Sequence, residues 1–421
     1  MLSSARKILL QSPKQLTTLI RPTNSFIIKR RNYSGSSIFK GARNYFLGFR
    51  NNSEDSQINN NNNNNNNNSS MHYDSVDELI PYVKYPLFTK EQLKKIATDK
   101  FKLQVGHASF GYHSDSIVPS INSLSDLTDP TLLNSLLPRR RPQGSPSDTL
   151  SIKAGDDTML VSPSVIAVAD GVSGWESDGI TSSSGIWSRS MVETFSRLMT
   201  EYKLNHFPHY LNQRDIQEIL DDSYLHTSHL MDLQKLNGSS TLILGMLNGD
   251  LLSIVSIGDS KIFIIRDGEI VLTNEEQTKA GLCPEQIGTH TLDHLPSDIA
   301  WIKSFKLMEG DYILMCSDGI SDNLYEWEIL NYLNEWINTK SNNNNNNNVK
   351  NIASKLLIKA KEVAFDDYAY TPYNEKVNSL NNTNGGSNGT NHSQGGKVDD
   401  MSVIIAKVEL NKKDNTKLVI N

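Results

Sequence analysis

Two apolar segments that each end at an Asp-Gly pair constrain the fold of this chain more than any other feature. Residues 165–169 (Val-Ile-Ala-Val-Ala) carry no charge and run directly into Asp170-Gly171. Residues 313–316 (Ile-Leu-Met-Cys) are followed, after one serine, by Asp318-Gly319. Uncharged runs of this length are typical of buried strands. Most Asp-Gly pairs after strands are ordinary turns, but two aspartates at the ends of two buried strands can also converge on one cation.

The centre of the chain predicts β-hairpins. Asn248-Gly249-Asp250 separates two apolar runs, and Asp267-Gly268 separates residues 261–266 from residues 269–273. Asn-Gly between apolar strands is the strongest short hairpin signal. We therefore expect an antiparallel meander in which Gly258-Asp259-Ser260 joins two strands. Asp267-Gly268 is well explained as a hairpin turn, so an Asp-Gly pair alone does not establish a site.

Apolar residues recur with helical spacing in four segments that accompany these strands. The segments are 184–202, 214–231, 324–337 and 352–363, and the apolar stripe of the third includes Trp327. Stripes of this kind are more often core than cofactor contacts. Helices beside antiparallel strands predict an α/β sandwich of layered sheets and helices.

Asparagine tracts mark the borders of the folded part. Asn59–Asn68 and Asn342–Asn348 are unbroken tracts, and residues 378–396 are rich in Asn, Gly, Ser and Thr. The two tracts cannot bury apolar surface, so we predict that both are disordered insertions. We expect a linker at 34–100, a folded domain at 101–410 with insertions at 341–348 and 378–396, and a tail at 411–421.

The first fifty residues have the composition of a mitochondrial transit peptide. They contain no Asp or Glu, and basic residues are spread among Leu, Ile, Ser and Thr. Arg31-Asn32-Tyr33-Ser34 resembles a matrix-processing pattern, which predicts that residues 1–33 are removed. The alternative is a disordered basic arm. The targeting interpretation places the mature protein in the mitochondrial matrix.

Bulk properties argue against several other classes. The formal net charge of −6 gives no reason to expect nucleic acid as a partner. Cys283 and Cys316 do not make a disulfide framework and are not spaced as metal ligands. We predict that Cys316 is a small core residue. The chain has no apolar run of the ~20 residues needed to span a membrane. We expect a monomer.

Five short corners next to apolar strands carry aspartates. They contain Asp156-Asp157, Asp170, Asp259, Asp318 and Asp399-Asp400. No matching set of His or Cys accompanies them, and oxygen-only ligation suits Mg²⁺ or Mn²⁺. Several carboxylates in one site suggest two ions that share a bridging aspartate. Two such ions can activate a water and hold both oxygens of a phosphoryl displacement.

The order of these corners resembles the metal-dependent type 2C Ser/Thr protein phosphatases. The motifs are Gly-Asp-Asp, Ala-Asp-Gly-Val-Ser-Gly-Trp, Gly-Ser-Ser-Thr (238–241), Gly-Asp-Ser, Ser-Asp-Gly and Asp-Asp-Met-Ser, and they cover residues 150–408. The Asp-Gly-Val-Ser-Gly-Trp form and Gly395-Gly396-Lys397 look most like the mitochondrial, T-cell-activation phosphatase branch. The resemblance implies an α+β fold, a four-layer αββα sandwich of two antiparallel β-sheets flanked by helices.

The same resemblance implies roles for individual residues. Asp170 would bridge two Mg²⁺ or Mn²⁺ ions, and Asp157 would hold the water that attacks, which makes these two the catalytic residues. Asp259 would lie near a weaker third ion, and Asp400 is not assigned to metal. The implied metal-binding residues are Asp156, Asp170, the Gly171 carbonyl, Asp259, Asp318 and Asp399.

Two positions depart from the wider family. Val172 replaces a histidine that is a candidate general acid, so the proton for the leaving group must come from water. Ile152 stands about where the family has a phosphate-binding arginine. Its neighbour Lys153 is either a replacement for that arginine or a solvated lysine. Arg139–Arg141 could attract a phosphorylated substrate, but we favour a surface or regulatory loop.

These features predict a phosphatase that hydrolyses phosphoserine and phosphothreonine in mitochondrial proteins by direct attack of water, without a phosphoenzyme. One alternative is a catalytically weak or inactive fold-mate that serves as a scaffold or regulatory binding protein. A second is a phosphohydrolase with an aspartyl nucleophile. That class requires Asp-x-Asp after a strand, and Val172 argues against it.

Overall fold

A computed structural model describes residues 88–112, 139–142, 145–146, 148–172, 184–233, 236–291, 294–338, 349–383 and 392–411. The predicted transit peptide, both asparagine tracts and the Ser173-Gly174-Trp175 end of the second motif lie outside the described residues. None of the described helices is long and apolar enough to cross a membrane.

Two antiparallel sheets form the body of the protein. The five-stranded sheet has the order β1-β16-β15-β9-β10 and the seven-stranded sheet the order β14-β8-β7-β5-β4-β3-β2. The strands of the first are β1 (Phe101–Phe110), β9 (Lys261–Arg266), β10 (Glu269–Thr273), β15 (Tyr312–Cys316) and β16 (Met401–Leu410). Those of the second are β2 (Arg139–Arg140), β3 (Leu150–Ala154), β4 (Asp157–Val161), β5 (Val165–Ala169), β7 (Leu242–Asn248), β8 (Leu251–Ile257) and β14 (Trp301–Lys306). Two short pairs, β6 (Ser239–Ser240) with β13 (Ile287–Gly288) and β11 (Thr278–Ala280) with β12 (Cys283–Pro284), lie outside these sheets.

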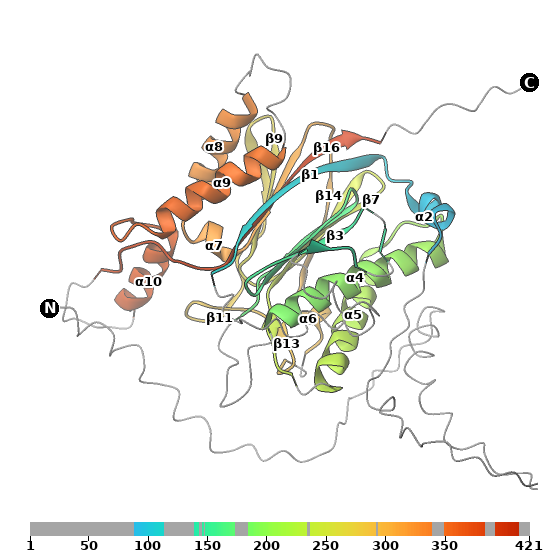
Figure 1. Cartoon of the computed structure of the whole chain (residues 1–421), viewed down its shortest axis with the longest axis horizontal. Coiled ribbons are helices and arrows are strands. Elements are labelled where there is room, and N and C mark those ends of the chain that lie inside the picture. The colour runs from blue at the N-terminus through green and yellow to red at the C-terminus, as the bar shows by residue number, and fades with distance from the viewer. Residues whose placement is uncertain are drawn as a thin grey trace, which may run out of the picture. The chain divides into compact units, whose positions relative to one another are not determined.

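Helices cover the outer face of each sheet, which makes four layers (Figure 1). The helices are α2 (Lys90–Ile96), α4 (Ser184–His206), α5 (Gln213–Leu233), α6 (Pro296–Ile299), α7 (Asp318–Ser321), α8 (Glu326–Asn338), α9 (Val349–Ala364) and α10 (Pro372–Thr383). Helix α4 packs on β3, β4 and β5, with α5 beside it, and α9 packs on β1 and β16. The predicted αββα sandwich is therefore confirmed.

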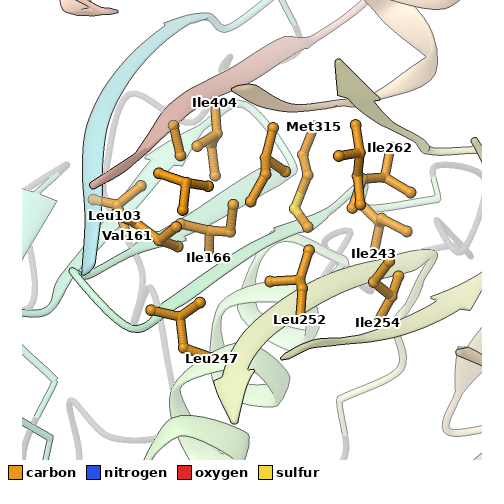
Figure 2. Packing of buried hydrophobic residues seen from close by; sticks show 14 of the residues in the cluster. Leu103, Val161, Ile166, Ile243, Leu247, Leu252, Ile254, Ile262, Met315 and Ile404 are labelled. Carbon is orange, nitrogen blue, oxygen red and sulfur yellow. The ribbon is translucent and has the colours of Figure 1, made fainter. Parts of the chain in front are cut away.

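The apolar runs of the sequence are uninterrupted because the strands are buried on both faces. Along β9, Ile262 and Ile264 point into the core between the sheets, and Phe263 and Ile265 pack under the helices. The same alternation holds in β15 and β16. Figure 2 shows the core between the sheets, where Met315 and Ile404 face Ile166 and Leu252. Cys316 is fully buried, as predicted.

The predicted single meander is wrong, although both of its hairpins exist. The β7–β8 hairpin belongs to the seven-stranded sheet and the β9–β10 hairpin to the five-stranded sheet. Gly258-Asp259-Ser260 therefore carries the chain from one sheet to the other. Gly258 has a φ of +98°, which only glycine adopts readily. Hairpin signals are local and do not specify which sheet a hairpin joins.

Three smaller expectations also differ from the structure. Residues 88–100 were assigned to the linker, but they include α2 and the buried Asp99. The Asn-rich insertion expected at 378–396 begins inside α10, which continues to Thr383, and Asn378 is buried and donates through Nδ2 to the Ser393 carbonyl. Trp327 is 61% exposed, because the buried face of α8 runs through Ile329 and Leu333 and a residue two positions before Ile329 lies on the opposite side of the helix.

A buried ionic network fastens α4 to the edge of the seven-stranded sheet. Glu193 of α4 accepts hydrogen bonds from Arg140 of β2, at 3.0 and 2.8 Å, and from Arg189 at 3.2 Å. Arg189 also donates to the Ser151 hydroxyl of β3. Burial lowers the pKa of Arg189 to about 10, and Glu193 opposes that shift. Arg140 is thus a buried structural residue, not part of a surface loop.

Replacing Glu193 with alanine should lower the free energy of unfolding by about 3–5 kcal/mol, because it leaves two buried guanidinium groups without their carboxylate. Urea unfolding followed by circular dichroism measures the change. Glu218→Ala is the matched control, since its partner Arg214 is 67% exposed, and it should cost no more than about 0.5 kcal/mol. Equal losses for the two variants would contradict the structural role of Glu193.

Candidate metal centre

The aspartate corners of both sheets meet at one end of the sandwich. Asp170 follows β5 of the seven-stranded sheet, and Asp318 and Asp399 adjoin β15 and β16 of the other sheet. Asp157, Asp318, Asp399 and Asp259 are all close enough to raise the pKa of the Asp170 carboxyl. Sequence reasoning expected this convergence, and the structure shows it for the described residues.

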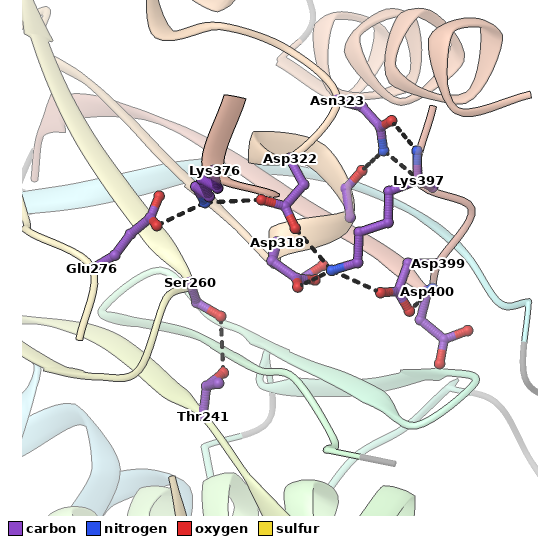
Figure 3. Close-up of polar contacts among 12 residues, drawn as sticks. Thr241, Ser260, Glu276, Asp318, Asp322, Asn323, Lys376, Lys397, Asp399 and Asp400 are labelled. Atoms are coloured by element: carbon purple, nitrogen blue, oxygen red, sulfur yellow. Dashed lines mark hydrogen bonds and ion pairs between the residues drawn. The ribbon is translucent and has the colours of Figure 1, made fainter. Parts of the chain in front are cut away.

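Backbone hydrogen bonds fix the position of Asp170. Its N–H donates to the Thr241 hydroxyl at 3.2 Å, and the Thr241 N–H donates to its carbonyl at 2.9 Å. The Thr241 hydroxyl also pairs with that of Ser260, at 2.9 Å (Figure 3). Ser260 follows Asp259 on the crossing between the sheets, so these hydroxyls join the β5 corner to the Asp259 corner.

The Asp156-Asp157 corner is the tight turn between β3 and β4. Gly155 allows this turn with a φ of +63°. Asp400 accepts hydrogen bonds from the backbone N–H of Asp156, at 2.8 Å, and of Tyr112, at 2.6 Å. Asp400 therefore holds the turn of one sheet against the first residues of β16 in the other. These hydrogen bonds give Asp400 a structural role between the two sheets.

Gly171 lies directly against the same turn. A β-carbon added at Gly171 would lie 2.4 Å from the Asp156 carbonyl oxygen and 2.7 Å from the Asp156 Cβ. The absence of a side chain thus lets the β5 corner and the β3–β4 turn approach each other. Asp156, Asp170 and the Gly171 carbonyl are brought together in this way.

A lysine lies among the carboxylates of the five-stranded sheet (Figure 3). Lys397 Nζ forms an ion pair with Asp318, and lies 2.8 Å from Asp322 Oδ2 and 3.2 Å from Asp399 Oδ2. Burial alone would raise the pKa of Asp318, but Lys397 outweighs it and holds that pKa below the usual value.

The charged forms of the other carboxylates in the site are disfavoured. Burial raises the pKa of Asp157 and Asp170 well above the usual range, and neighbouring carboxylates raise it further. Burial together with Asp318 raises the pKa of Asp259 to about 8 and that of Asp399 to about 6. Like charges brought together out of water repel, and a shared cation relieves that repulsion.

The donor set fits a hard divalent cation. Neither Asp157 oxygen, nor Asp259 Oδ1, has a hydrogen bond of good geometry within the described residues, although all three atoms are buried. Buried polar atoms without partners are rare and point to a missing ion or water. Among the described residues no three ligand-type side chains are already arranged around one point. Lys397 lies between three of the carboxylates, Asp318, Asp322 and Asp399.

Sequence reasoning did not assign roles to Asp322 and Lys397. Asp322 comes four residues after Asp318 in a helical turn, and that spacing puts both on one face. Lys397 lies two residues before Asp399 in an extended segment, and that spacing also places side chains on one side. Both signals were present in the sequence. The sequence does not show that the α7 turn lies next to the segment that precedes β16. The ion pairs of Lys397 with Asp318 and Asp322 depend on that contact.

Lys153 is half-buried beside the site. Its Nζ donates to the Gly155 carbonyl at 2.6 Å and lies next to Asp156 and to Gly185, at the beginning of α4. Burial lowers the pKa of Lys153, and Asp156 partly restores it. The alternative of a freely solvated lysine is therefore wrong. The hydroxyl of Ser184 donates to the Val172 carbonyl at 2.6 Å.

Comparison with known proteins agrees with this architecture. Residues 153–356 match the family model of protein phosphatase 2C. The chain is 29% identical over 266 residues to probable protein phosphatase 2C 1 of Oryza sativa subsp. japonica, covering 61% of this chain and 70% of the relative. It is 27% identical over 296 residues to the protein phosphatase PTC7 homolog fig of Drosophila ananassae, covering 68% and 82%.

A solved structure shares the fold. The X-ray structure of the photosystem II phosphatase PBCP aligns with a TM-score of 0.50 and 24% identity, over 73% of this chain and 99% of that one. The shared feature is the fold of two antiparallel sheets flanked by helices. Residues 153–356 of the chain form a protein phosphatase 2C domain, and the chain is a protein serine/threonine phosphatase.

Gly171→Ala should weaken Mn²⁺ binding by about 10–100-fold, because the added methyl group pushes the Asp156 turn away from Asp170. Isothermal titration of the EDTA-stripped protein with MnCl₂ measures the affinity. Gly281→Ala is the control, since no atom lies within 4 Å of its added β-carbon. Its positive φ costs about 1–2 kcal/mol of stability but should leave the affinity unchanged. If Gly171→Ala binds Mn²⁺ as tightly as wild type does, the close contact between Gly171 and Asp156 is not needed for metal binding.

Proposed function

We propose that the chain hydrolyses phosphoserine and phosphothreonine in proteins by direct attack of water, at a centre of two divalent cations held by the aspartate corners. The observation that carries this proposal is the convergence of carboxylates from both sheets around Asp170. Bound Mg²⁺ or Mn²⁺ would supply an activated water and charge neutralisation at the phosphate. Asp156, Asp170, the Gly171 carbonyl, Asp318 and Asp399 are the residues that would hold the ions.

Asp157 is the best placed residue to orient the attacking water. It is fully buried beside the Ser317 and Ser402 hydroxyls, and among the described residues neither of its oxygens has a hydrogen bond of good geometry, so the carboxylate can accept a further hydrogen bond. Its raised pKa, which burial causes, favours the acceptance of a proton. A carboxylate in this position can therefore align the nucleophile and take its proton.

Lys153 is the protein cation that we propose for contact with the substrate phosphate. Lys153 is half-buried beside Asp156 and close to the first turn of α4, so a small shift of its Nζ from the Gly155 carbonyl would bring it to a phosphate oxygen. Val172 has no proton to give, and the proton of the leaving alkoxide must come from water.

Neither alternative is favoured. A scaffold without activity has no need for the full set of carboxylates, yet Asp156, Asp157, Asp170, Asp318 and Asp399 are all present and adjacent. An aspartyl nucleophile would require a second aspartate at position 172, where the chain has valine.

Asp170→Asn should lower kcat on a phosphothreonine peptide by at least ~100-fold, because it removes the bridging carboxylate. Release of inorganic phosphate is measured with and without MnCl₂, and EDTA should abolish the wild-type rate. Asp267→Asn is the matched control. It alters the exposed Asp-Gly pair of the β9–β10 turn, where Asp267 has a φ of +51°, and should leave the rate within about twofold.

Activity that survives EDTA, or an Asp170→Asn rate close to that of Asp267→Asn, would contradict the two-cation mechanism. A phosphoenzyme trapped by acid quench on Asp170 would instead support the aspartyl-nucleophile alternative. Absence of any turnover in a wild-type protein that binds Mn²⁺ would favour the scaffold alternative.

We also propose that the enzyme works in the mitochondrial matrix on phosphorylated mitochondrial proteins. The acid-free basic composition of residues 1–50 and the resemblance of Gly395-Gly396-Lys397 to the mitochondrial branch support this.

Residues 1–50 fused to a fluorescent reporter should direct it to mitochondria and be cleaved near Tyr33/Ser34. Microscopy and N-terminal sequencing of the recovered reporter measure both. The control fusion replaces the basic residues of this segment with serine and should stay in the cytosol. A cytosolic wild-type fusion would reject the targeting proposal while leaving the phosphatase proposal intact.

A further inference from the structure

Lys397 is built into the carboxylate centre as firmly as the aspartates are. Its ammonium group pairs with Asp318, Asp322 and Asp399 at once, and its side chain is only 23% exposed. The Nζ also lies 5.5 Å from the centre of the Tyr373 ring, which favours a positive charge at that point. Three carboxylates from two separate segments thus share one ammonium.

The backbone of Lys397 is clamped on both sides by one amide. Its N–H donates to Asn323 Oδ1 at 2.9 Å, and its carbonyl accepts from Asn323 Nδ2 at 2.8 Å. Asn323 is 1% exposed and also donates to the Gly319 carbonyl at 2.9 Å. The α7 turn that carries Asp318 and Asp322 therefore holds the lysine that neutralises them. A long side chain on a fixed backbone loses less entropy when it binds in one place.

A second lysine supports the outer side of the same cluster. Lys376 of α10 lies 2.9 Å from Asp322 Oδ1 and 2.7 Å from Glu276. Asp322 is thus paired on both oxygens, by Lys376 on one and Lys397 on the other. Asp259, which is 8% exposed and has one oxygen without a partner, faces the same group of charges.

We propose that Lys397 is a permanent internal cation that occupies the Asp318–Asp322–Asp399 side of the site and limits the centre to two divalent ions. An ammonium and a divalent ion cannot share one point between the same three carboxylates, because both are positive. Lys397 pairs with one oxygen of each of these aspartates, and the second Asp399 oxygen accepts from the Asp400 N–H at 2.8 Å. A carboxylate oxygen has more than one lone pair, so these contacts still allow Asp318 and Asp399 to bind a metal. The inference rests on the proposed two-cation function, and it rejects the possible third ion near Asp259.

Lys397→Met tests the proposal, since methionine keeps the unbranched shape and removes the charge. The full chain, stripped with EDTA, is titrated with MnCl₂ by calorimetry, and the bound ions are counted by Mn²⁺ electron paramagnetic resonance. Wild type should bind two ions. Lys397→Met should bind a third at millimolar Mn²⁺, and its metal-free Tm should fall by about 4 °C because three carboxylates then repel. Lys397→Arg keeps the charge and should still bind two ions.

A double variant separates charge from folding. Lys397→Met combined with Asp322→Asn removes one positive and one negative charge, so it should bind two ions and recover at least half of the lost Tm. If Lys397→Met alone does not fold without metal, the double variant still allows the bound ions to be counted in a protein that lacks the lysine. Lys376→Met, which leaves Asp318 and Asp399 untouched, should keep two ions and is the matched control for loss of a lysine.

The outcomes are distinct. Two ions in Lys397→Met, bound more tightly than in wild type, would show that the lysine merely competes with a metal, and would overturn the proposal. Three ions in the Lys397→Arg or double variant would overturn it as well. If wild type binds no Mn²⁺, the proposed function itself is wrong. If wild type and Lys397→Met both bind two ions, only the inference about Lys397 is wrong.

Discussion

The structure depends on the repulsion among buried carboxylates that the fold forces together. Asp157, Asp170, Asp259 and Asp399 all have raised pKa values, because burial removes water from each and neighbouring carboxylates add to the effect. Such an arrangement lowers the stability of the folded chain unless cations compensate. Strong packing between the sheets and hydrogen bonds to Asp170 and Asp400 keep the corners in place against this repulsion. The site is thus a region where stability has been exchanged for the capacity to bind positive charge.

Lysine side chains neutralise the carboxylates of the five-stranded sheet, whereas the carboxylates of the seven-stranded sheet depend on bound ions for positive charge. Lys397 and Lys376 neutralise the carboxylates that follow β15 and precede β16. The aspartates of the seven-stranded sheet lie beside Lys153, which donates to the Gly155 carbonyl. The two sheets therefore contribute differently: one brings its own cations, and the other presents Asp157, whose oxygens make no hydrogen bond of good geometry within the part of the chain that the structure describes.

Much of the fold was predictable from local patterns, because the strands are buried on both faces and read as uninterrupted apolar runs. Both hairpins, the two strands that end in Asp-Gly, and the helices α4, α5 and α9 were located by such patterns. The assignment of hairpins to different sheets was not predictable, since strand pairing beyond the turn depends on long-range packing. Trp327 was misplaced for a similar reason: helical spacing gives a stripe, but tertiary contacts decide where a helix begins and which part is covered.

The site shows the same limit. Asp170-Gly171, Asp318-Gly319 and Asp267-Gly268 are identical as dipeptides, yet the first two adjoin the carboxylate centre and the third is a hairpin turn. Only the order of several corners distinguished them. The crossing at Gly258-Asp259-Ser260 has a wider consequence, because the site draws a corner from each sheet and from the segment that joins them. The centre can exist only while the two sheets stay docked, so any ion bound there acts as a cross-link between the halves of the sandwich and slows their separation.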